Sequence, residues 1–413
     1  MPTTRIDDCT TGMILDADLV GDGGRVLLPA GACLSDSLIA ALKGRGVSGI
    51  SIRGRGADNA QAEEFPEKIL VQSEEYVRKF FMFVDLNQEA AFEMYRLCLP
   101  RVASRLASGW VPPADRWNDS PDDAGLPPDM FFRDEGALED LIAAEVSLAP
   151  FPDVYLKLLE VLNSPHSTLE EAAGIITKDV GLSAKILKLV NSPFYGAPSA
   201  VDSIPRAVMI LGLKEISSLA IGVSAIAAFK DIPPGLINMR SFWQHSFTCA
   251  VLAKILAGMA GGVSGERMFT AALLHDVGRL VILKKLPHAA AYAMLYARAG
   301  YLPLIEGERD VLGFEHATVG GRLLAAWKLP ESLCADVFYH HDPGGAPEPR
   351  EAAIIQLADN LARTMDVSEG GWAAIPGVDP EQFDALNLPS GALAQAIENA
   401  ESQTQGLMGA FFG

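Results

Sequence analysis

Several histidines and aspartates in the second half of the chain are of the types that bind metal ions in proteins. His275 and Asp276 stand side by side in the apolar stretch AALLHDVGRLVILKK, residues 271–285. Burying a carboxylate without a partner costs several kcal/mol, so this pair needs either a hydrogen-bonding partner or a metal ion. The same reasoning applies to Asp359 in the apolar stretch AAIIQLADNLAR. Four further candidates are His245, His316, His340 and His341.

Imidazole and carboxylate groups that project inward from several helices are the usual means by which helical bundles bind metal ions. A donor set of nitrogen and oxygen atoms without thiolates is suited to Fe, Mn, Ni, Zn or Mg. Cys249 lies one helical turn after His245 and could approach the same site, but the sequence favours the role of a small buried apolar residue. A polar cluster that is satisfied by internal hydrogen bonds, without metal, is the alternative interpretation.

The part of the chain that carries these residues has the periodicity of helices. Either of two pairs would form a capping box at a helix start: Ser167 with Glu170, or Thr168 with Glu171. Asp179 is then expected to begin a second helix. Alternation with a period of two residues is nearly absent after residue 144, so the sequence predicts an all-helical bundle.

Composition and periodicity divide the chain into four regions. Residues 1–58 predict a small α+β module in which a strand, a helix and a second strand follow one another. Residues 63–110 predict a helical connector. Residues 111–140 contain five prolines and nine acids against two arginines, which predicts an exposed acidic linker. Residues 144–405 predict the helical bundle, so the expected fold class is mainly α.

The overall composition argues against several classes of partner. The formal net charge is −19, and the sequence has no cluster of lysines and arginines of the kind that binds nucleic acid. Acids stand near the N-terminus where a signal peptide would have an apolar core, and no apolar run reaches the ~18 residues that a membrane helix needs. The five cysteines are widely spaced without a CxxC pair, so free thiols are expected. These features predict a cytoplasmic protein that binds neither nucleic acid nor a membrane.

The stretch HDVGR at residues 275–279, between an upstream histidine and a downstream aspartate, resembles the motif of the HD superfamily of metal-dependent phosphohydrolases. More narrowly, residues 144–405 resemble an HDOD domain, a relative of the HD-GYP phosphodiesterases. The stretches that carry this resemblance occur in the family's order: DVGLSAKILKLVNSPFYG, SIPRAVMILGLKEISSLAIG, FTAALLHDVGRLVI and HATVGGRLLAAWKLPESLCADVFYHH. Residues 1–58 are similar to the small domain found ahead of some HD-GYP and HDOD domains.

The resemblance implies a site for one or two divalent metal ions. The residues that correspond to the first set of ligands in HD enzymes are His245, His275, Asp276 and Asp359. The residues that correspond to the additional histidines of HD-GYP enzymes are His316, His340 and His341. The resemblance also implies that Asp276 would bridge two ions. If the protein is an enzyme, Asp276 and Arg279 are its implied catalytic residues, with Arg279 orienting a phosphate group.

The chain departs from the HD-GYP pattern in two places that matter for catalysis. Arg279 stands where those enzymes have the lysine of HDxxK, and HHDPGGAPEPREAA stands where they have the GYP loop. These departures put hydrolysis of a cyclic dinucleotide in doubt more than they put metal binding in doubt.

Two functions are therefore compatible with the sequence. The favoured one is a bacterial-type regulatory protein in signal transduction, in which the HDOD domain senses a ligand or binds a protein partner. The alternative is a metal-dependent phosphohydrolase that acts on a nucleotide or cyclic dinucleotide. Part of the apolar stretch MILGLKEISSLAIGVSAIAAF could also serve a homodimer.

Overall fold

The computed structural model describes most of the chain, with gaps near the N-terminus and between the connector and the bundle. The described residues are 3–9, 13, 15, 17–21, 26–28, 34, 36–52, 65–112, 129, 137–148, 157, 158, 161, 168–195, 200–229, 232, 235–367 and 374–412. All the residues that the sequence proposes for a metal site lie within these ranges.

The N-terminal part contains the small strands of the molecule. Strand β1 (Thr3–Arg5) pairs antiparallel with β4 (Gly49–Ser51), and β2 (Leu19–Val20) pairs antiparallel with β3 (Val26–Leu28). Helix α1 (Asp36–Gly44) lies between β3 and β4 in the chain and buries Leu38 and Leu42. The strand, helix and strand therefore follow one another in the predicted order.

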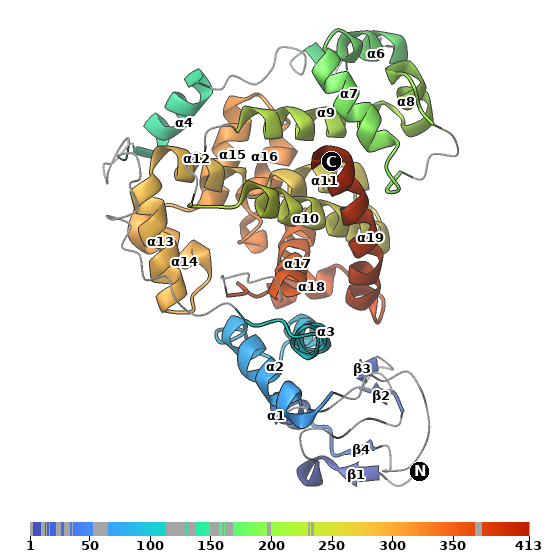
Figure 1. The fold of residues 1–413 in the computed structure, drawn as a ribbon, viewed down its shortest axis with the longest axis vertical. Helices are drawn as coiled ribbons and strands as arrows, with labels where there is room; N and C mark the ends of the chain where they lie inside the picture. Colours follow the sequence, from blue (N-terminus) through green and yellow to red (C-terminus); the bar gives the residue numbers. More distant parts are fainter. Residues whose placement is uncertain are drawn as a thin grey trace.

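Two long helices follow and lie between the strands and the rest of the molecule (Figure 1). They are α2 (Glu67–Phe80) and α3 (Glu89–Ala107), which pack against each other. Helix α4 (Ala137–Leu148) begins inside the stretch 111–140 that the sequence predicts as a linker. Most of the remaining predicted linker lies outside the described residues.

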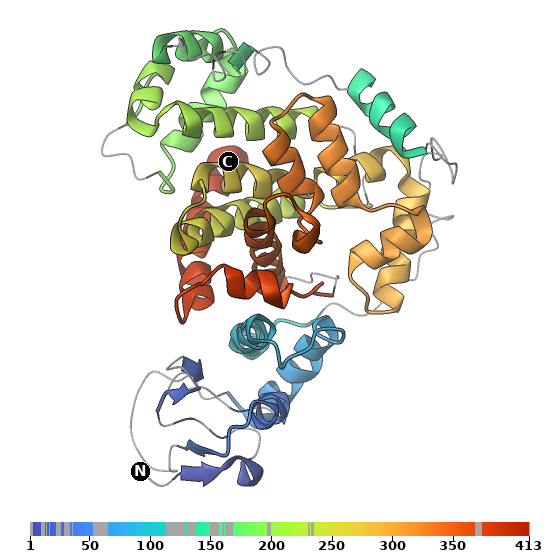
Figure 2. The same ribbon diagram turned by 180° about the vertical axis from the view of Figure 1, so that it is seen from behind.

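The remainder of the described chain is a bundle of helices, which is seen from behind in Figure 2. Its helices are α6 (Leu169–Thr177), α7 (Val180–Val190), α8 (Ile204–Leu211), α9 (Leu213–Ala228), α10 (Met239–Ala260), α11 (Gly265–Leu274), α12 (Val277–Lys285), α13 (Pro287–Ala299), α14 (Leu304–Leu312), α15 (His316–Ala326), α16 (Glu331–Phe338), α17 (Pro349–Asp366), α18 (Pro380–Ala385) and α19 (Ala392–Phe412). The expectation of a mainly α fold is confirmed.

Local sequence signals explain where several of these helices begin. Thr168 and Glu171 form the capping box of α6, each accepting a hydrogen bond from the backbone of the other. The Asp179 carboxylate accepts a hydrogen bond from the backbone N–H of Leu182 at the start of α7, as predicted. The sequence alone could not choose between the Thr168 and Ser167 pairs.

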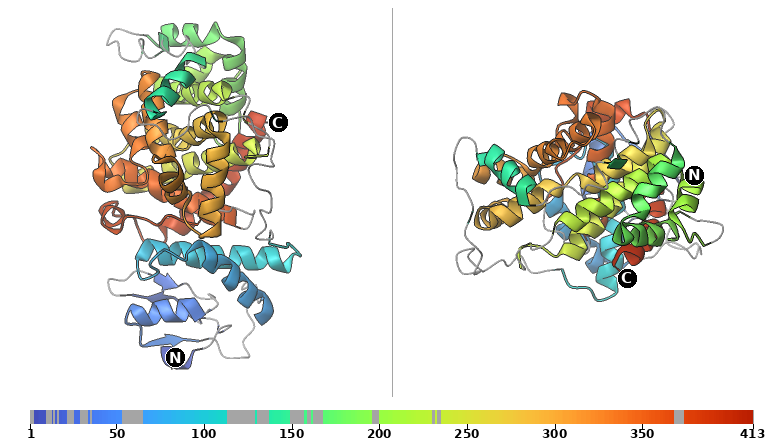
Figure 3. Two further views of the ribbon diagram at one scale, coloured as in Figure 1. Left: turned by 90° about the vertical axis from the view of Figure 1, so that its left-hand side faces the viewer. Right: turned by 90° about the horizontal axis from the view of Figure 1, so that it is seen from above.

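Helix α10 is the central element of the bundle, because α11, α17 and α19 all pack against it. Its middle section buries Phe247, Val251 and Leu252 completely or nearly so. Helix α17 in turn contacts α3, so the connector touches the bundle directly, as the side view in Figure 3 shows. Among the described helices, none is both long and apolar enough to cross a membrane.

Candidate metal centre

The structure brings all the metal-ligand candidates of the sequence into one region of the bundle. They come from α10, from the break between α11 and α12, from the start of α15, from the turn after α16, and from α17. The candidates are His245, His275, Asp276, His316, His340, His341 and Asp359. Five of these seven side chains are at most 1% exposed, so the cluster belongs to the interior of the bundle.

The break between α11 and α12 positions the central pair. His275 is the last residue with helical backbone angles at the end of α11, and Asp276 precedes the first turn of α12. An aspartate at such a position usually caps the new helix by accepting a hydrogen bond from a backbone N–H of its first turn. The Asp276 carboxylate makes no such cap and is turned toward the cluster instead.

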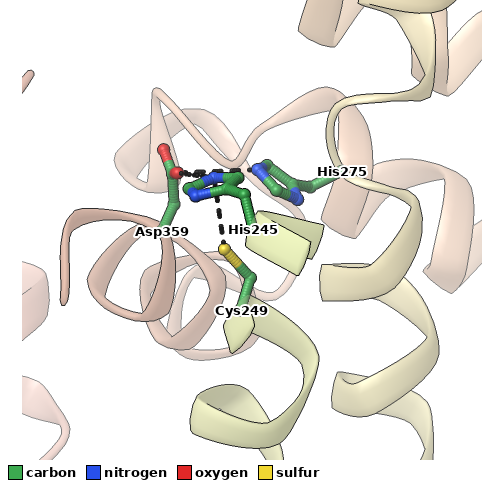
Figure 4. Close-up of side chains that lie close together, drawn as sticks. All are labelled: His245, Cys249, His275 and Asp359. Carbon is green, nitrogen blue, oxygen red and sulfur yellow. Dashed lines mark hydrogen bonds and ion pairs between the residues drawn. The ribbon is translucent and has the colours of Figure 1, made fainter. Parts of the chain in front are cut away.

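One half of the cluster lies between α10, α11 and α17 (Figure 4). The Nε2 atom of His245 is 2.9 Å from Oδ1 of Asp359, and the Nε2 atom of His275 is 3.5 Å from the same oxygen. The Sγ atom of Cys249 is 3.4 Å from Nε2 of His245. One donor atom from each of these four residues lies within 4.8 Å of the others, so a single ion could be bound by all four.

The other half lies between α12, α15 and the turn after α16. The Nε2 atom of His316 is 3.1 Å from Oδ1 of Asp276 and 3.0 Å from Nε2 of His341. His340 belongs both to the histidine group of this half and to a group with His275 and Asp276. Asp276 Oδ1 is also 3.6 Å from Nε2 of His275, so this carboxylate lies between the two halves.

Three buried polar atoms of the cluster make no well-directed hydrogen bond to any described residue. They are Nε2 of His275, Oδ1 of Asp276 and Nε2 of His340. Leaving such atoms without a partner costs about 1–3 kcal/mol each. In both histidines the other ring nitrogen is engaged, since Nδ1 donates to a backbone oxygen: that of Ala272 at 2.6 Å and that of Val337 at 2.7 Å. This arrangement directs the Nε2 lone pairs into the cluster, as in histidines that bind metals.

The pKa values of His340 and Asp276 are shifted in directions that suit metal binding. Burial, together with His275 and His316, lowers the pKa of His340 to about 3, so its ring is neutral at physiological pH. Burial would raise the pKa of Asp276, but Arg279 and the neighbouring histidines hold it well below its usual range. A neutral imidazole and an ionised carboxylate are the forms that coordinate a cation.

The structure also reveals residues that support the cluster and that the sequence did not single out. Glu308 on α14 places Oε2 2.5 Å from Nδ1 of His316 and 2.9 Å from its backbone nitrogen. Burial would lower the pKa of His316, but Glu308 and Asp276 raise it to about 10, so an ion that binds this ring must displace a proton from it. Glu308 therefore orients the ring and also accepts the first N–H of α15. No local pattern connects this glutamate to a histidine eight residues later.

Two further supporting residues lie on α17 beyond Asp359. Arg363 donates from Nε to the Asp359 carboxylate at 2.9–3.0 Å, and Asp366 Oδ2 is 3.2 Å from Nδ1 of His245. Their spacing of four and seven residues from Asp359 puts them on its face of the helix, so helical periodicity could have identified them. Arg279 is likewise engaged, because its NH1 atom is 2.6 Å from Oδ2 of Asp276.

Cys249 adds a sulfur atom to a donor set that the sequence predicts to contain only nitrogen and oxygen. Burial raises the pKa of its thiol to about 11, although His245 beside it has the opposite effect. The thiol is therefore protonated at neutral pH unless a bound cation displaces the proton. A thiolate among the donors would shift the preference of the site toward softer ions such as Zn²⁺. The residues present fit a divalent metal ion.

Comparison with known protein families identifies one match. The family model for the HDOD domain matches residues 148–343, which include all the candidate ligands except Asp359. A solved structure described as a candidate phosphohydrolase from Shewanella amazonensis is 25% identical to this chain. It aligns with 67% of this chain and 98% of its own length, with a TM-score of 0.54.

Curated proteins that resemble the chain do so over part of their length. An uncharacterized protein of Treponema pallidum is 25% identical over 231 residues, which is 54% of this chain and 44% of that protein. The 3'-5' exoribonuclease YhaM of a Geobacillus strain is 26% identical over 168 residues, which is 38% of this chain and 49% of that protein. The chain thus spans less than half the length of these curated relatives.

Proposed function

Because residues 148–343 of this chain form an HDOD domain, we propose that the protein is a regulatory protein of signal transduction whose metal centre controls the state of the helical bundle. In this proposal, one ion is held by His245, His275, Asp276 and Asp359, with Cys249 beside it. A second ion would be held by His316, His340 and His341, with Asp276 shared between the two. The bundle would then communicate its state to the N-terminal helices and to a protein partner.

Two observations together support a regulatory role most strongly. The cluster is buried, and the arginine side chains beside it are already paired with carboxylates. His275, Asp276 and His340 are fully buried. The two guanidinium groups at the cluster, Arg279 and Arg363, already bind carboxylates of the centre. A hydrolytic site needs an open coordination position for water and a cation that can face the phosphate of a substrate.

A bound ion would act on this chain chiefly by connecting helices. When bound, a divalent ion would supply positive charge and Lewis acidity among the carboxylates and imidazoles. Its ligands come from α10, from the break between α11 and α12, from α15 and α17, and from the turn after α16, most of which are distant from one another in the chain. The free energy of binding would therefore contribute to the stability of the folded bundle.

A short path leads from the metal centre to the connector. Asp359 lies on α17, and the residue that follows this helix, Val367, accepts a hydrogen bond from the Tyr76 hydroxyl on α2 at 3.1 Å. The backbone N–H of Ile375 donates to the carbonyl oxygen of Phe80 at the end of α2, at 2.9 Å. A change in the position or stability of α17 would therefore alter the contacts that this region makes with α2 and α3.

The proposal is tested by hydrogen exchange of the full chain in its metal-loaded and metal-stripped forms. Metal is expected to slow exchange in α10 and α17 and also in α2 and α3, because these helices contact one another. The Asp276→Asn variant, treated in the same way, should show no response. Metal-dependent protection that stops at the ligand helices would contradict the regulatory proposal.

A metal-dependent phosphohydrolase acting on a nucleotide or cyclic dinucleotide is a second candidate. The position of Asp276 Oδ1 between His275 and His316 favours it, because a carboxylate between two ions is typical of two-metal hydrolases. The similarity to the candidate phosphohydrolase from Shewanella amazonensis also supports it. Turnover of nucleotides or bis-p-nitrophenyl phosphate by the metal-loaded protein, lost in Asp276→Asn, would establish this function in place of the regulatory one.

Replacing Glu308 by glutamine is expected to weaken metal binding about 10–100-fold, as loss of a partner that orients a histidine ligand typically does. The amide has nearly the same shape but lacks the charge that holds Nδ1 of His316 at 2.5 Å. Metal affinity is measured by competition with a chromophoric chelator. Glu306→Gln on the same helix is the control, since the Glu306 side chain is 46% exposed and contacts Arg309 rather than the cluster. Equal metal affinity in the two variants would show that Glu308 does not support a ligand.

A further inference from the structure

A cavity of about 950 Å³ lies where the connector meets the bundle, outside the histidine cluster. Its walls are formed by α3, by the first half of α10, by the end of α17 and by α19. Helix α3 crosses the end of the bundle at which α17, α18 and α19 lie (Figure 1). Cavities of about 300–1,000 Å³ are the size at which proteins bind small molecules.

Arginines line this cavity on two sides. Arg101 and Arg105 are one helical turn apart on α3, and Arg240 lies in the first turn of α10. The chain as a whole has a formal net charge of −19. Three arginines around one cavity therefore give this region a charge opposite in sign to that of the chain. Guanidinium groups match the oxygen atoms of a phosphate in two-point hydrogen bonds.

The two carboxylates that line the same cavity both have partners already. Glu401 on α19 forms an ion pair with Arg101, and Asp366 at the end of α17 contacts Nδ1 of His245. The Glu401 pair engages Arg101 as well, and the three arginines of the wall outnumber its two carboxylates. The Asp366 contact also places the cavity directly beside the metal centre.

One hydroxyl group in the cavity wall is out of reach of a ligand. Thr404 on α19 is 6% exposed, and its Oγ1 atom itself has almost no accessible surface, so a molecule in the cavity cannot contact that atom. Leu97 and Met408 provide an apolar part of the wall, which suits a flat, weakly polar group such as a nucleobase.

We propose that this cavity is a binding site for a small molecule that carries a phosphate group and an apolar or aromatic part, of the nucleotide class. The phosphate would lie against the arginines of α3 and α10, and the rest of the ligand would lie against α19. Such a ligand would hold the connector to the bundle. The inference goes beyond the function proposed above, because none of these contacts requires a metal ion.

The site is tested by isothermal titration calorimetry of the full metal-loaded chain with guanosine monophosphate, guanosine and inorganic phosphate. The nucleotide is expected to bind. Arg240→Met should weaken its binding about tenfold or more, because a charge-assisted hydrogen bond is lost. Thr404→Val should leave binding unchanged, because the Thr404 Oγ1 atom is closed off from the cavity. Lys178→Met at the end of α6 removes the same charge from a distant surface and is the control.

The Asp276→Asn variant separates this site from the metal centre, and it is expected to bind the nucleotide as the wild type does. Loss of nucleotide binding in that variant would place the ligand on the metal and overturn the proposal. Absence of binding by all three probes, or unchanged binding by Arg240→Met, would overturn it as well. Tighter binding of the nucleotide than of phosphate would assign the site to nucleotides, whereas equal binding would support a site for free phosphate.

Discussion

Replacing Asp276 by asparagine is expected to abolish metal binding while the helices stay folded. Oδ1 of Asp276 lies 3.1 Å from Nε2 of His316 and 3.6 Å from Nε2 of His275, so this oxygen faces both halves of the cluster. Asparagine keeps the shape but removes the negative charge that a divalent ion requires. Elemental analysis of the purified proteins, beside circular dichroism, measures the effect.

The same substitution has a cost for stability that a second variant can separate from metal loss. Arg279 would lose the carboxylate that its NH1 atom contacts at 2.6 Å, and breaking such a buried pair costs about 3–5 kcal/mol. The double variant Asp276→Asn, Arg279→Met removes the unpaired cation and is expected to recover stability without recovering metal. Stoichiometric metal in Asp276→Asn would contradict the assignment of Asp276 as a ligand. A folded wild type that takes up no Mn, Fe, Ni, Zn or Mg would mean that the cluster is held by internal contacts alone.

Replacing Gly278 by alanine is expected to lower the free energy of unfolding by about 3 kcal/mol or more, near the upper end for overpacked sites. A Cβ atom on Gly278 would lie 2.0 Å from the backbone oxygen of His316 and 2.6 Å from the backbone nitrogen of Gly320. Both atoms belong to the backbone of α15, which cannot move aside as a flexible side chain could. Denaturant unfolding measures the loss of stability.

The Gly278 substitution should also weaken metal binding, because separating α12 from α15 moves His316 away from Asp276. Gly174→Ala is the matched control, since Gly174 lies within α6 and its Cβ would meet nothing within 4 Å. Alanine there is expected to be neutral or to stabilise the protein by up to about 1 kcal/mol, because alanine favours the helix. Equal stability of the two alanine variants would show that α12 and α15 can separate without cost.

The features that could be predicted from the sequence are those decided within a few residues of the chain. The capping box of Thr168 with Glu171 and the cap at Asp179 depend on hydrogen bonds that span three residues. The residue types therefore predict where α7 begins and limit the start of α6 to two neighbouring positions. The fold class was predictable for the same reason, because apolar periodicity marks each helix separately. The candidate metal ligands could be proposed because a histidine or aspartate in an apolar stretch needs a partner.

The packing of the helices decided everything that joins distant parts of the chain. No sequence pattern places the Glu308 carboxylate on His316, and none brings α12 so close to α15 that Gly278 has no room for a Cβ. The sequence favoured a small apolar role for Cys249 and left its approach to the site as the alternative, and its sulfur lies 3.4 Å from Nε2 of His245. The cavity between α3 and the bundle likewise exists only once the connector has docked.

By itself, then, the sequence determined which residue types are present and where most helices form, since those properties follow from local hydrogen bonds and apolar periodicity. Only the tertiary structure decided which of those residues meet and how deeply they are buried. It also decided which group contacts the second ring nitrogen of each histidine and the second oxygen of each carboxylate. The physical reason is that these contacts depend on the angle and distance at which whole helices pack. Those quantities are set by the fit of many side chains together rather than by any short stretch of the chain.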